Sequence, residues 1–149
     1  MIKISTASNI AIDIAIAKLD QKNDGLSFGL IDGIFCGYFI EKEKVFPAIF
    51  MVGQGWSSQN KVKKNPNFQY ATTYCPTYDW SQAKQILLAN KAGFLFDESK
   101  NKWVSSVNKV EGDEPIVVAL KDILTTNYGE YLELGEEVEK YIQSVELKT

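Results

Sequence analysis

Histidine and arginine are both absent from this chain of 149 residues, and all 16 of its basic side chains are lysines. Without histidine the chain has no Ser-His-Asp or Cys-His pair, no ordinary zinc site and no near-neutral general base of the usual kind. Without arginine it has no guanidinium group for bidentate binding of phosphate or carboxylate. We therefore expect a protein that is not an enzyme and that uses no cofactor or metal.

Long apolar runs and a strong net charge are also missing, and the chain has only two cysteines. No apolar run approaches the roughly 18 residues that a membrane span needs, and Met1 to Ser5 lack the apolar core of a signal peptide. The net charge of −3 argues against a general nucleic-acid binder. The two cysteines, Cys36 and Cys75, are expected to be reduced and buried. The sequence thus predicts a cytoplasmic protein with one domain, residues 1–149.

The most distinctive stretch is 74–82, Tyr-Cys-Pro-Thr-Tyr-Asp-Trp-Ser-Gln. Its proline favours a turn, and Asp79 can cap the next helix by accepting hydrogen bonds from backbone N–H groups two and three residues on. Tyr74, Tyr78 and Trp80 then lie near a helix N-terminus, where free N–H groups and the dipole favour anions. This pattern indicates a binding corner without a catalytic signature.

Each side chain of this corner also has a structural interpretation. Asp79 is expected mainly as a helix cap, and Trp80 is more often a core residue than a ligand contact in a small α+β protein. Tyr74 and Tyr78 have polar tips that suit either a pocket wall or half-buried packing. Gln82 is the hardest to explain structurally, because a surface helix accepts many residues there, and it could read the edge of a base.

The nine residues resemble the central motif of the small phage NinX-like proteins, roughly Tyr-x-Pro-Ser-Thr-Asp-Trp-x-Gln-Gly-Gly. Residues 9–18, Asn-Ile-Ala-Ile-Asp-Ile-Ala-Ile-Ala-Lys, are similar to that family's opening Ala-Leu-Asp-Trp-Ala-Val-Ala-Lys. Residues 115–120, followed by Tyr128-Gly129 and the acidic run 130–137, resemble its closing helix and tail. The three pieces occur in the family's order.

The resemblance has clear departures. Tyr78 stands where the family has a small residue, and Ala83-Lys84 replace Gly-Gly, so a tight backbone approach to a ligand is not implied there. Residues 28–68 follow no family pattern. The family is functionally undefined, and the resemblance implies a phage accessory protein in the cytoplasm of an infected bacterium.

The N-terminal half predicts a helix followed by strands. A helix over 8–19 would present a broad apolar face of isoleucines and alanines, with Asp13 and Lys18 facing outward. Residues 27–32, 34–41 and 45–52 then alternate as strands. Asp32-Gly33 between the first two is a hairpin signal, and Pro47 places the third at an edge or a bulge.

The C-terminal half predicts two further helices and a hairpin. After a strand over 68–74 we expect a helix over 81–91, a hairpin from 94–97 and 102–107, and a long helix over 115–127 capped by Asp113. An acidic tail, 130–149, carries a short, partly exposed helix. The predicted fold class is α+β: a mainly antiparallel sheet, from 27–74 and 94–107, with the two longer helices packed on one face.

A polar loop, 53–67, interrupts this pattern and is expected to be mobile or functional. Its Gly53-x-Gly55-Trp56 resembles a phosphate-cradling loop, but no Lys-Ser/Thr pair follows at the required spacing. Three lysines at 61, 63 and 64 form either a solvated patch or a guide for an anion. The glutamates of the tail match no metal-binding spacing.

Two functions remain open, and both are non-catalytic. The first is sequestration of a small anionic nucleotide-type ligand, such as a host-defence signal, which would stack on aromatic side chains. The alternative is a protein–protein module that inhibits a host or phage enzyme. A nucleotide site should be a concave pocket or a homo-oligomer interface, whereas an inhibitor should show its aromatics on an open patch. The candidate ligand-binding residues are Trp56, Tyr74, Thr77, Tyr78, Asp79, Trp80, Gln82 and Lys84.

Overall fold

The computed structural model describes residues 1–20, 26–41, 44–45, 50–52, 66–68 and 71–147, and the fold class is α+β, as predicted. The described helices are α1 (Asn9–Asp20), α3 (Trp80–Ala89), α4 (Pro115–Tyr128) and α5 (Glu136–Leu147). The described strands are β1 (Ile2–Lys3), β2 (Ser27–Ile31), β3 (Ile34–Tyr38), β4 (Ile40–Glu41), β5 (Lys44–Val45), β6 (Phe50–Val52), β7 (Thr72–Tyr74), β8 (Phe94–Asp97), β9 (Lys102–Ser105), β10 (Glu111–Gly112) and β11 (Tyr131–Leu132).

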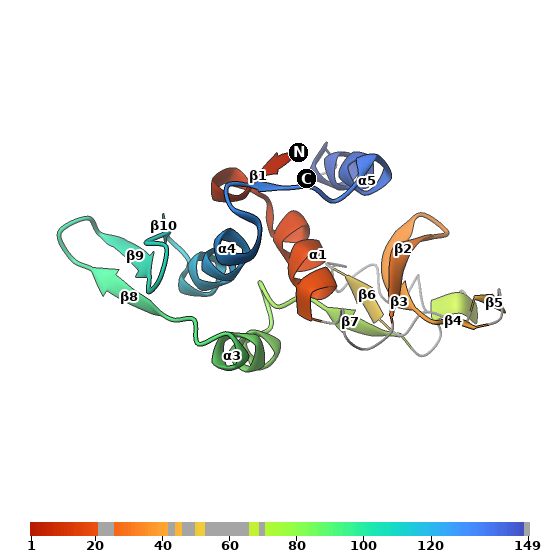
Figure 1. Ribbon diagram of the computed structural model, residues 1–149, viewed down its shortest axis with the longest axis horizontal. Helices are drawn as coiled ribbons and strands as arrows, with labels where there is room; N and C mark the ends of the chain where they lie inside the picture. Colours follow the sequence, from red (N-terminus) through yellow and green to blue (C-terminus); the bar gives the residue numbers. More distant parts are fainter. Residues whose placement is uncertain (21–25, 42–43, 46–49, 53–65, 69–70, 148–149) are drawn as a thin grey trace.

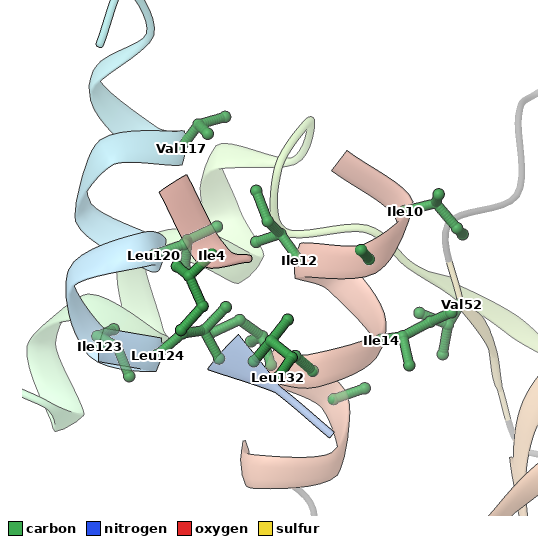
Figure 2. Close-up of a cluster of buried hydrophobic side chains, with 14 of the residues drawn as sticks. Ile4, Ile10, Ile12, Ile14, Val52, Val117, Leu120, Ile123, Leu124 and Leu132 are labelled. Atoms are coloured by element: carbon green, nitrogen blue, oxygen red, sulfur yellow. The ribbon is translucent and has the colours of Figure 1, made fainter. Parts of the chain in front are cut away.

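Helix α1 lies at the centre of the molecule. Figure 1 shows the β2-β3-β6-β7 sheet on one side of it and α4 with strands β8 to β10 on the other. All residues from Ile10 to Ala17 are buried, and apart from Asp13 all of them are apolar, which is typical of a helix enclosed by the rest of the protein. In Figure 2 Ile12 lies on the side of α4, and Ile14 lies next to Val52 of β6.

Asp13 does not face outward as predicted, because α1 has no solvent-exposed face at this position. Its side chain is only 1% exposed. The prediction assumed that a helix packed on one sheet leaves its polar residue in water. Here the turn between β7 and α3 lies on Asp13 instead, and Thr77 of that turn provides the hydrogen bonds that a buried carboxyl group needs.

The β2–β3 hairpin forms where the sequence predicted it. Ile31 pairs with Ile34, so Asp32 and Gly33 are the two turn residues, and their φ angles are +51° and +78°. Two positive φ values are what a type I′ turn requires, and Asp-Gly tolerates them. The sheet continues in the order β2-β3-β6-β7, and its last pair, β6–β7, is parallel. Pro47 lies outside the described residues.

Residues 94–107 do not join this sheet, which corrects the prediction of a sheet shared by 27–74 and 94–107. The described part contains a separate three-stranded antiparallel sheet in the order β10-β9-β8 and two short pairs, β1-β11 and β4-β5. Helix α4 packs on all three strands of the β10-β9-β8 sheet. Helix α1 contacts both α4 and β6 of the β2-β3-β6-β7 sheet, so it lies between the two larger sheets.

Helix α4 begins and ends close to the predicted positions, but its cap differs. Pro115 is the first helical residue and Glu114 is the N-cap, without a side-chain capping bond. The carboxylate of Asp113 instead pairs with Lys102 Nζ at 2.6 Å, so the predicted Asp113 cap is wrong. Gly129 follows the helix with a φ of +81°, a conformation that glycine adopts without strain.

The acidic tail forms α5, which is mostly exposed and buries Ile142 against the core. Its first turn carries Glu136, Glu137 and Glu139, where carboxylates favour the helix dipole. Among the described helices, none has the length and apolar character needed to cross a membrane.

Candidate functional site

The turn between β7 and α3 is the corner that the sequence singled out. The backbone N–H groups of Tyr78 and Asp79 both donate to the carbonyl of Cys75, at 2.9 Å each. The Asp79 carboxylate then accepts hydrogen bonds from the backbone N–H groups of Ser81 and Gln82, at 2.9 and 3.4 Å. The predicted helix cap is therefore confirmed, and the carboxylate occupies the N-terminus of α3, where an anion would otherwise bind.

Gln82 holds the turn against the end of β7. Its Nε2 donates to the carbonyl of Thr73 at 2.9 Å, and its Oε1 accepts from the backbone N–H of Cys75 at 2.8 Å. The side-chain amide therefore satisfies a strand end and a turn at once. This gives a structural reason for Gln82, the residue that the sequence left hardest to explain.

Thr77 connects the corner to the central helix. Its backbone N–H donates to Asp13 Oδ1 at 3.0 Å, and its hydroxyl donates to Asp13 Oδ2 at 2.8 Å. Both side chains are buried. Burial raises the pKa of Asp13 to about 7, although the two hydrogen bonds from Thr77 oppose the rise. A lone polar residue in the apolar run 10–17 was the signal that could have predicted this buried bond.

Tyr74 and Cys75 also point into the protein. The Tyr74 hydroxyl donates to Asp20 Oδ2 at 3.0 Å, and burial followed by the negative charge of Asp20 raises the pKa of this phenol well above its usual range. Burial raises the pKa of the half-buried Cys75 thiol, and Asp13 and Asp79 add to the rise. Neither Cys36 nor Cys75 is in a disulfide, as predicted; Cys36 is buried as expected, whereas Cys75 is only half-buried, so the prediction that both are buried is wrong for Cys75. A thiol with a raised pKa is a poor nucleophile at neutral pH.

Three of the predicted site residues remain accessible. Tyr78 is 77% exposed and Trp80 is 49% exposed, and Lys84 is exposed as well. Trp80, Lys84 and the exposed Leu88 follow one another at a spacing of four residues, which places them along one side of α3. We call Tyr78, Trp80, Lys84 and Leu88 the α3 ridge. Trp56 lies outside the described residues.

Two concave regions among the described residues do not include the α3 ridge. A cleft of about 130 Å³ next to the Tyr74–Asp20 bond is lined by Ile16, Leu19, Asp20, Ile86, Asn90 and Ile123. An open depression of about 410 Å³ is lined by Met1, Tyr128, Glu130, Tyr131 and Glu133. Within the described residues, no group of three or more Cys, Asp or Glu side chains is arranged to hold a metal ion.

The structure therefore divides the predicted site in two. Tyr74, Thr77, Asp79 and Gln82 are engaged in hydrogen bonds that build the corner, whereas Tyr78, Trp80 and Lys84 face solvent on it. Comparison of the chain with models of known protein families, with curated proteins and with solved structures gave no match, so its resemblance to the NinX-like proteins stays a prediction.

Proposed function

We propose that this chain is a non-catalytic binding protein that contacts another protein through the α3 ridge. The observation that carries the proposal is the exposure of Tyr78 and Trp80 at the start of α3. Tyrosine and tryptophan are the residues most enriched at the energetic centres of protein interfaces. Exposure of large aromatic side chains to water is unfavourable in free energy, and burial against a partner protein would lower this free energy.

The backbone that carries these side chains is fixed before any partner arrives. Thr77 is bonded to Asp13 on one side of Tyr78, and Asp79 caps α3 on the other. Gln82 ties the first turn of α3 to β7. Because little backbone freedom is left to lose, the entropic cost of binding at this surface is low. This supports a role for the hydrogen bonds of the corner in presenting Tyr78 and Trp80.

A protein partner fits this surface better than a nucleotide does. The Asp79 carboxylate sits at the helix N-terminus, where the phosphate of a nucleotide would meet a like charge. The polar tips of Tyr74, Thr77 and Gln82 are already engaged and are not available to read a base.

Sequestration of a nucleotide-type ligand is the second candidate, and Lys84 favours it. This ammonium lies one helical turn beyond Trp80, so a base stacked on the indole could place a phosphate next to the lysine. In the setting that the NinX-like resemblance implies, the ligand would be a host-defence signal in the cytoplasm of an infected bacterium. The same setting provides a host or phage enzyme as the protein partner.

One experiment separates these candidates. Purified protein is immobilised and exposed to lysates of infected and uninfected bacteria, in parallel with Tyr78→Ala/Trp80→Ala and with the control Tyr128→Ala/Tyr131→Ala, which removes exposed tyrosines elsewhere. We expect one protein to be retained by the natural chain and the control but not by the ridge variant. Direct titration of that purified protein should then reproduce the difference.

The same preparations are incubated with a panel of cyclic nucleotides and ADP-ribose derivatives and then heat-denatured. Intact nucleotide released only from proteins with a natural ridge would overturn the proposal in favour of sequestration, and Lys84→Glu should then weaken binding in a salt-dependent way. Altered products would identify an enzyme. Retention of the same proteins by all variants would show that the ridge is not the contact surface.

A further inference from the structure

Strand β8 is the open edge of the β10-β9-β8 sheet. Its four residues pair with β9 on one side, and Figure 1 shows β8 along the margin of this sheet, away from β10. Edge strands are usually protected by charged side chains. Here Leu95 is 77% exposed and Phe96 is also exposed, so the middle of β8 is apolar and accessible.

The register shows which backbone groups point outward. The backbone N–H of Ser106 donates to the carbonyl of Gly93 at 3.0 Å, which makes this a hydrogen-bonded pair. In antiparallel strands hydrogen-bonded and non-hydrogen-bonded pairs alternate, so Leu95 bonds to β9 and Phe94 and Phe96 do not. The N–H and C=O groups of Phe94 and Phe96 therefore face away from β9, toward the open side.

The side chains of β8 divide between two faces. The rings of Phe94 and Phe96 both pack edge-on against Trp103, with centroids 5.4 and 5.2 Å apart. Gly112, the cross-strand partner of Trp103, lies against Val118 of α4, so this is the face that α4 covers. Leu95 is on the opposite face and is left without a cover.

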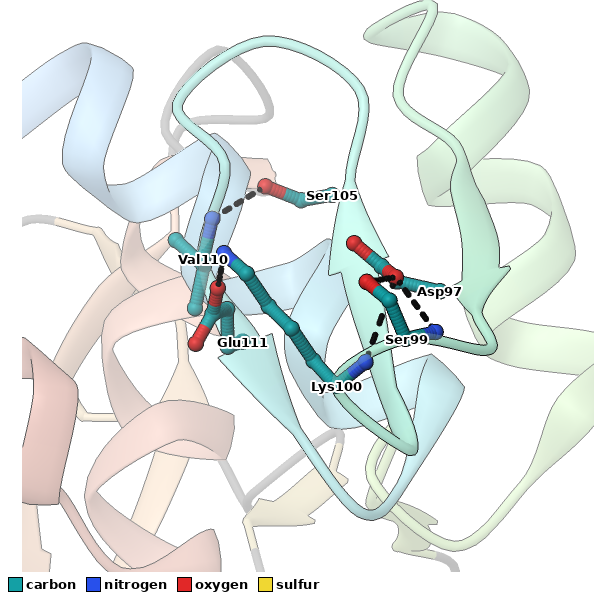
Figure 3. Close-up of polar contacts among 6 residues, drawn as sticks. All are labelled: Asp97, Ser99, Lys100, Ser105, Val110 and Glu111. Atoms are coloured by element: carbon teal, nitrogen blue, oxygen red, sulfur yellow. Dashed lines mark hydrogen bonds and ion pairs between the residues drawn. The ribbon is translucent and has the colours of Figure 1, made fainter.

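The hairpin that carries this edge is held in shape by its own side chains. Figure 3 shows the turn after β8, where Asp97 Oδ1 accepts hydrogen bonds from the Ser99 hydroxyl and from the backbone N–H groups of Ser99 and Lys100. At the other end of the sheet Ser105 Oγ accepts from the backbone N–H of Val110 at 2.8 Å. The strand is therefore preorganised for pairing.

We propose that β8 pairs antiparallel with β8 of a second copy of this chain, around a two-fold axis at Leu95. Phe94 then faces Phe96 of the second copy, and their outward N–H and C=O groups form four hydrogen bonds. Leu95 meets Leu95 of the second copy in a non-hydrogen-bonded pair, where side chains are closest. A two-fold contact of this kind uses one surface twice and closes as a dimer.

The charges at the two ends of the strand favour this orientation. The C-terminal end carries Asp97 and Glu98, and the nearest charged residue before the strand is Lys91. Antiparallel pairing at Leu95 places Asp97 opposite Gly93, so the acidic end of each strand lies at the end of the other strand that Lys91 precedes. Parallel pairing would place two aspartates side by side, which is destabilising. The charges at the strand ends therefore favour antiparallel over parallel pairing of the two copies.

A four-residue edge is small for a protein interface, so we expect association that is reversible and needs a high protein concentration. Cross-linking can capture it. In a Cys75→Ser background, Leu95→Cys places two thiols at the two-fold axis, whereas the control Val104→Cys places a thiol on the same face of the central strand β9. Under mild oxidation we expect a disulfide-linked dimer from Leu95→Cys at least tenfold faster than from Val104→Cys.

Sedimentation of the natural chain over a wide concentration range provides the second readout. We expect a monomer–dimer equilibrium that Leu95→Lys shifts to monomer, with an unchanged circular dichroism spectrum showing that the fold survives. Equal cross-linking rates for the two cysteine variants, a monomer at every concentration, or a dimer that Leu95→Lys leaves intact would each overturn the proposal. A strand from a different protein bound at β8 would overturn it as well.

Discussion

Thr77 and Asp13 lie 64 positions apart in the sequence and are joined by two hydrogen bonds, both donated by Thr77 to the Asp13 carboxylate. This pair fixes the β7–α3 turn to the central helix. It also places an ionisable group where water does not reach. The consequences for stability can be measured.

We expect the stability of the protein to depend on pH through Asp13. Its pKa rises from 3.8 to about 7 on folding, so between these values the folded state binds more protons than the unfolded state, and this contribution to stability decreases as pH rises. A shift of this size corresponds to about 4 kcal/mol as an upper bound. Asp13→Asn removes the titration and can keep both contacts with Thr77.

Urea unfolding at a series of pH values tests this. The free energy of unfolding of Asp13→Asn relative to the natural protein should be near zero around pH 4, should become steadily more favourable as the pH rises from 4 to 7, and should level off above pH 7. A difference that does not change with pH would show that Asp13 titrates at its ordinary pKa.

Asp79→Ala should lower the free energy of unfolding by about 1 kcal/mol, because it removes the acceptor for two backbone N–H groups of α3. Asp79→Asn should retain most of the stability, since asparagine also caps well. Glu114→Ala is the matched control, because Glu114 is the N-cap of α4 but makes no side-chain capping bond. Equal effects at both positions would argue against the cap.

Gln82→Ala should cost about 1–3 kcal/mol, since it leaves the Thr73 carbonyl and the Cys75 N–H, both part-buried, without their partner. Gln85→Ala on the exposed side of the same helix should have almost no effect. The melting temperatures of the two variants, measured by thermal unfolding, test this difference. Similar melting temperatures for the two would show that water replaces the Gln82 amide.

Gly112→Ala tests the contact between α4 and its sheet. A Cβ at this position would lie 2.8 Å from Val118 Cγ2, and Val118 is a buried, β-branched residue with little freedom to move. We expect a loss of about 1–3 kcal/mol from overpacking. Val118→Ala should rescue part of it in the double variant, and a double variant no more stable than Gly112→Ala would locate the clash elsewhere.

The features that could be predicted from the sequence are local ones. The Asp32-Gly33 turn, the Asp79 cap and the start of α4 at Pro115 each depend on backbone preferences of a few adjacent residues. The α+β class followed from the change between helical and strand periodicity. Tyr78 and Trp80 were identified as candidates because aromatic residues cluster there, although the sequence did not show which of the aromatics would be exposed.

The features that could not be predicted depend on contacts between distant segments. Whether Asp13 faces water is decided by the β7–α3 turn, whose Thr77 lies 64 positions later, and Gln82 has a structural role only once β7 lies next to α3. The N-cap position of α4 is Glu114, and the carboxylate of Asp113 pairs with Lys102 on the neighbouring strand instead. The packing of α4 on β8, β9 and β10, which form a sheet of their own, is likewise a contact between distant segments.

The central position of α1 has a consequence for synthesis of the chain. The groups that cover its isoleucines come from β6, α4, β11 and α5, all of which leave the ribosome after it. During translation the apolar side chains of α1 are therefore exposed until the later segments of the core, the last of which contains Ile142, have been synthesised. Such exposed surface makes nascent chains prone to aggregation. We therefore expect a chain truncated after Asn108 to be insoluble or bound to chaperones, and a soluble, folded fragment of this length would contradict that expectation.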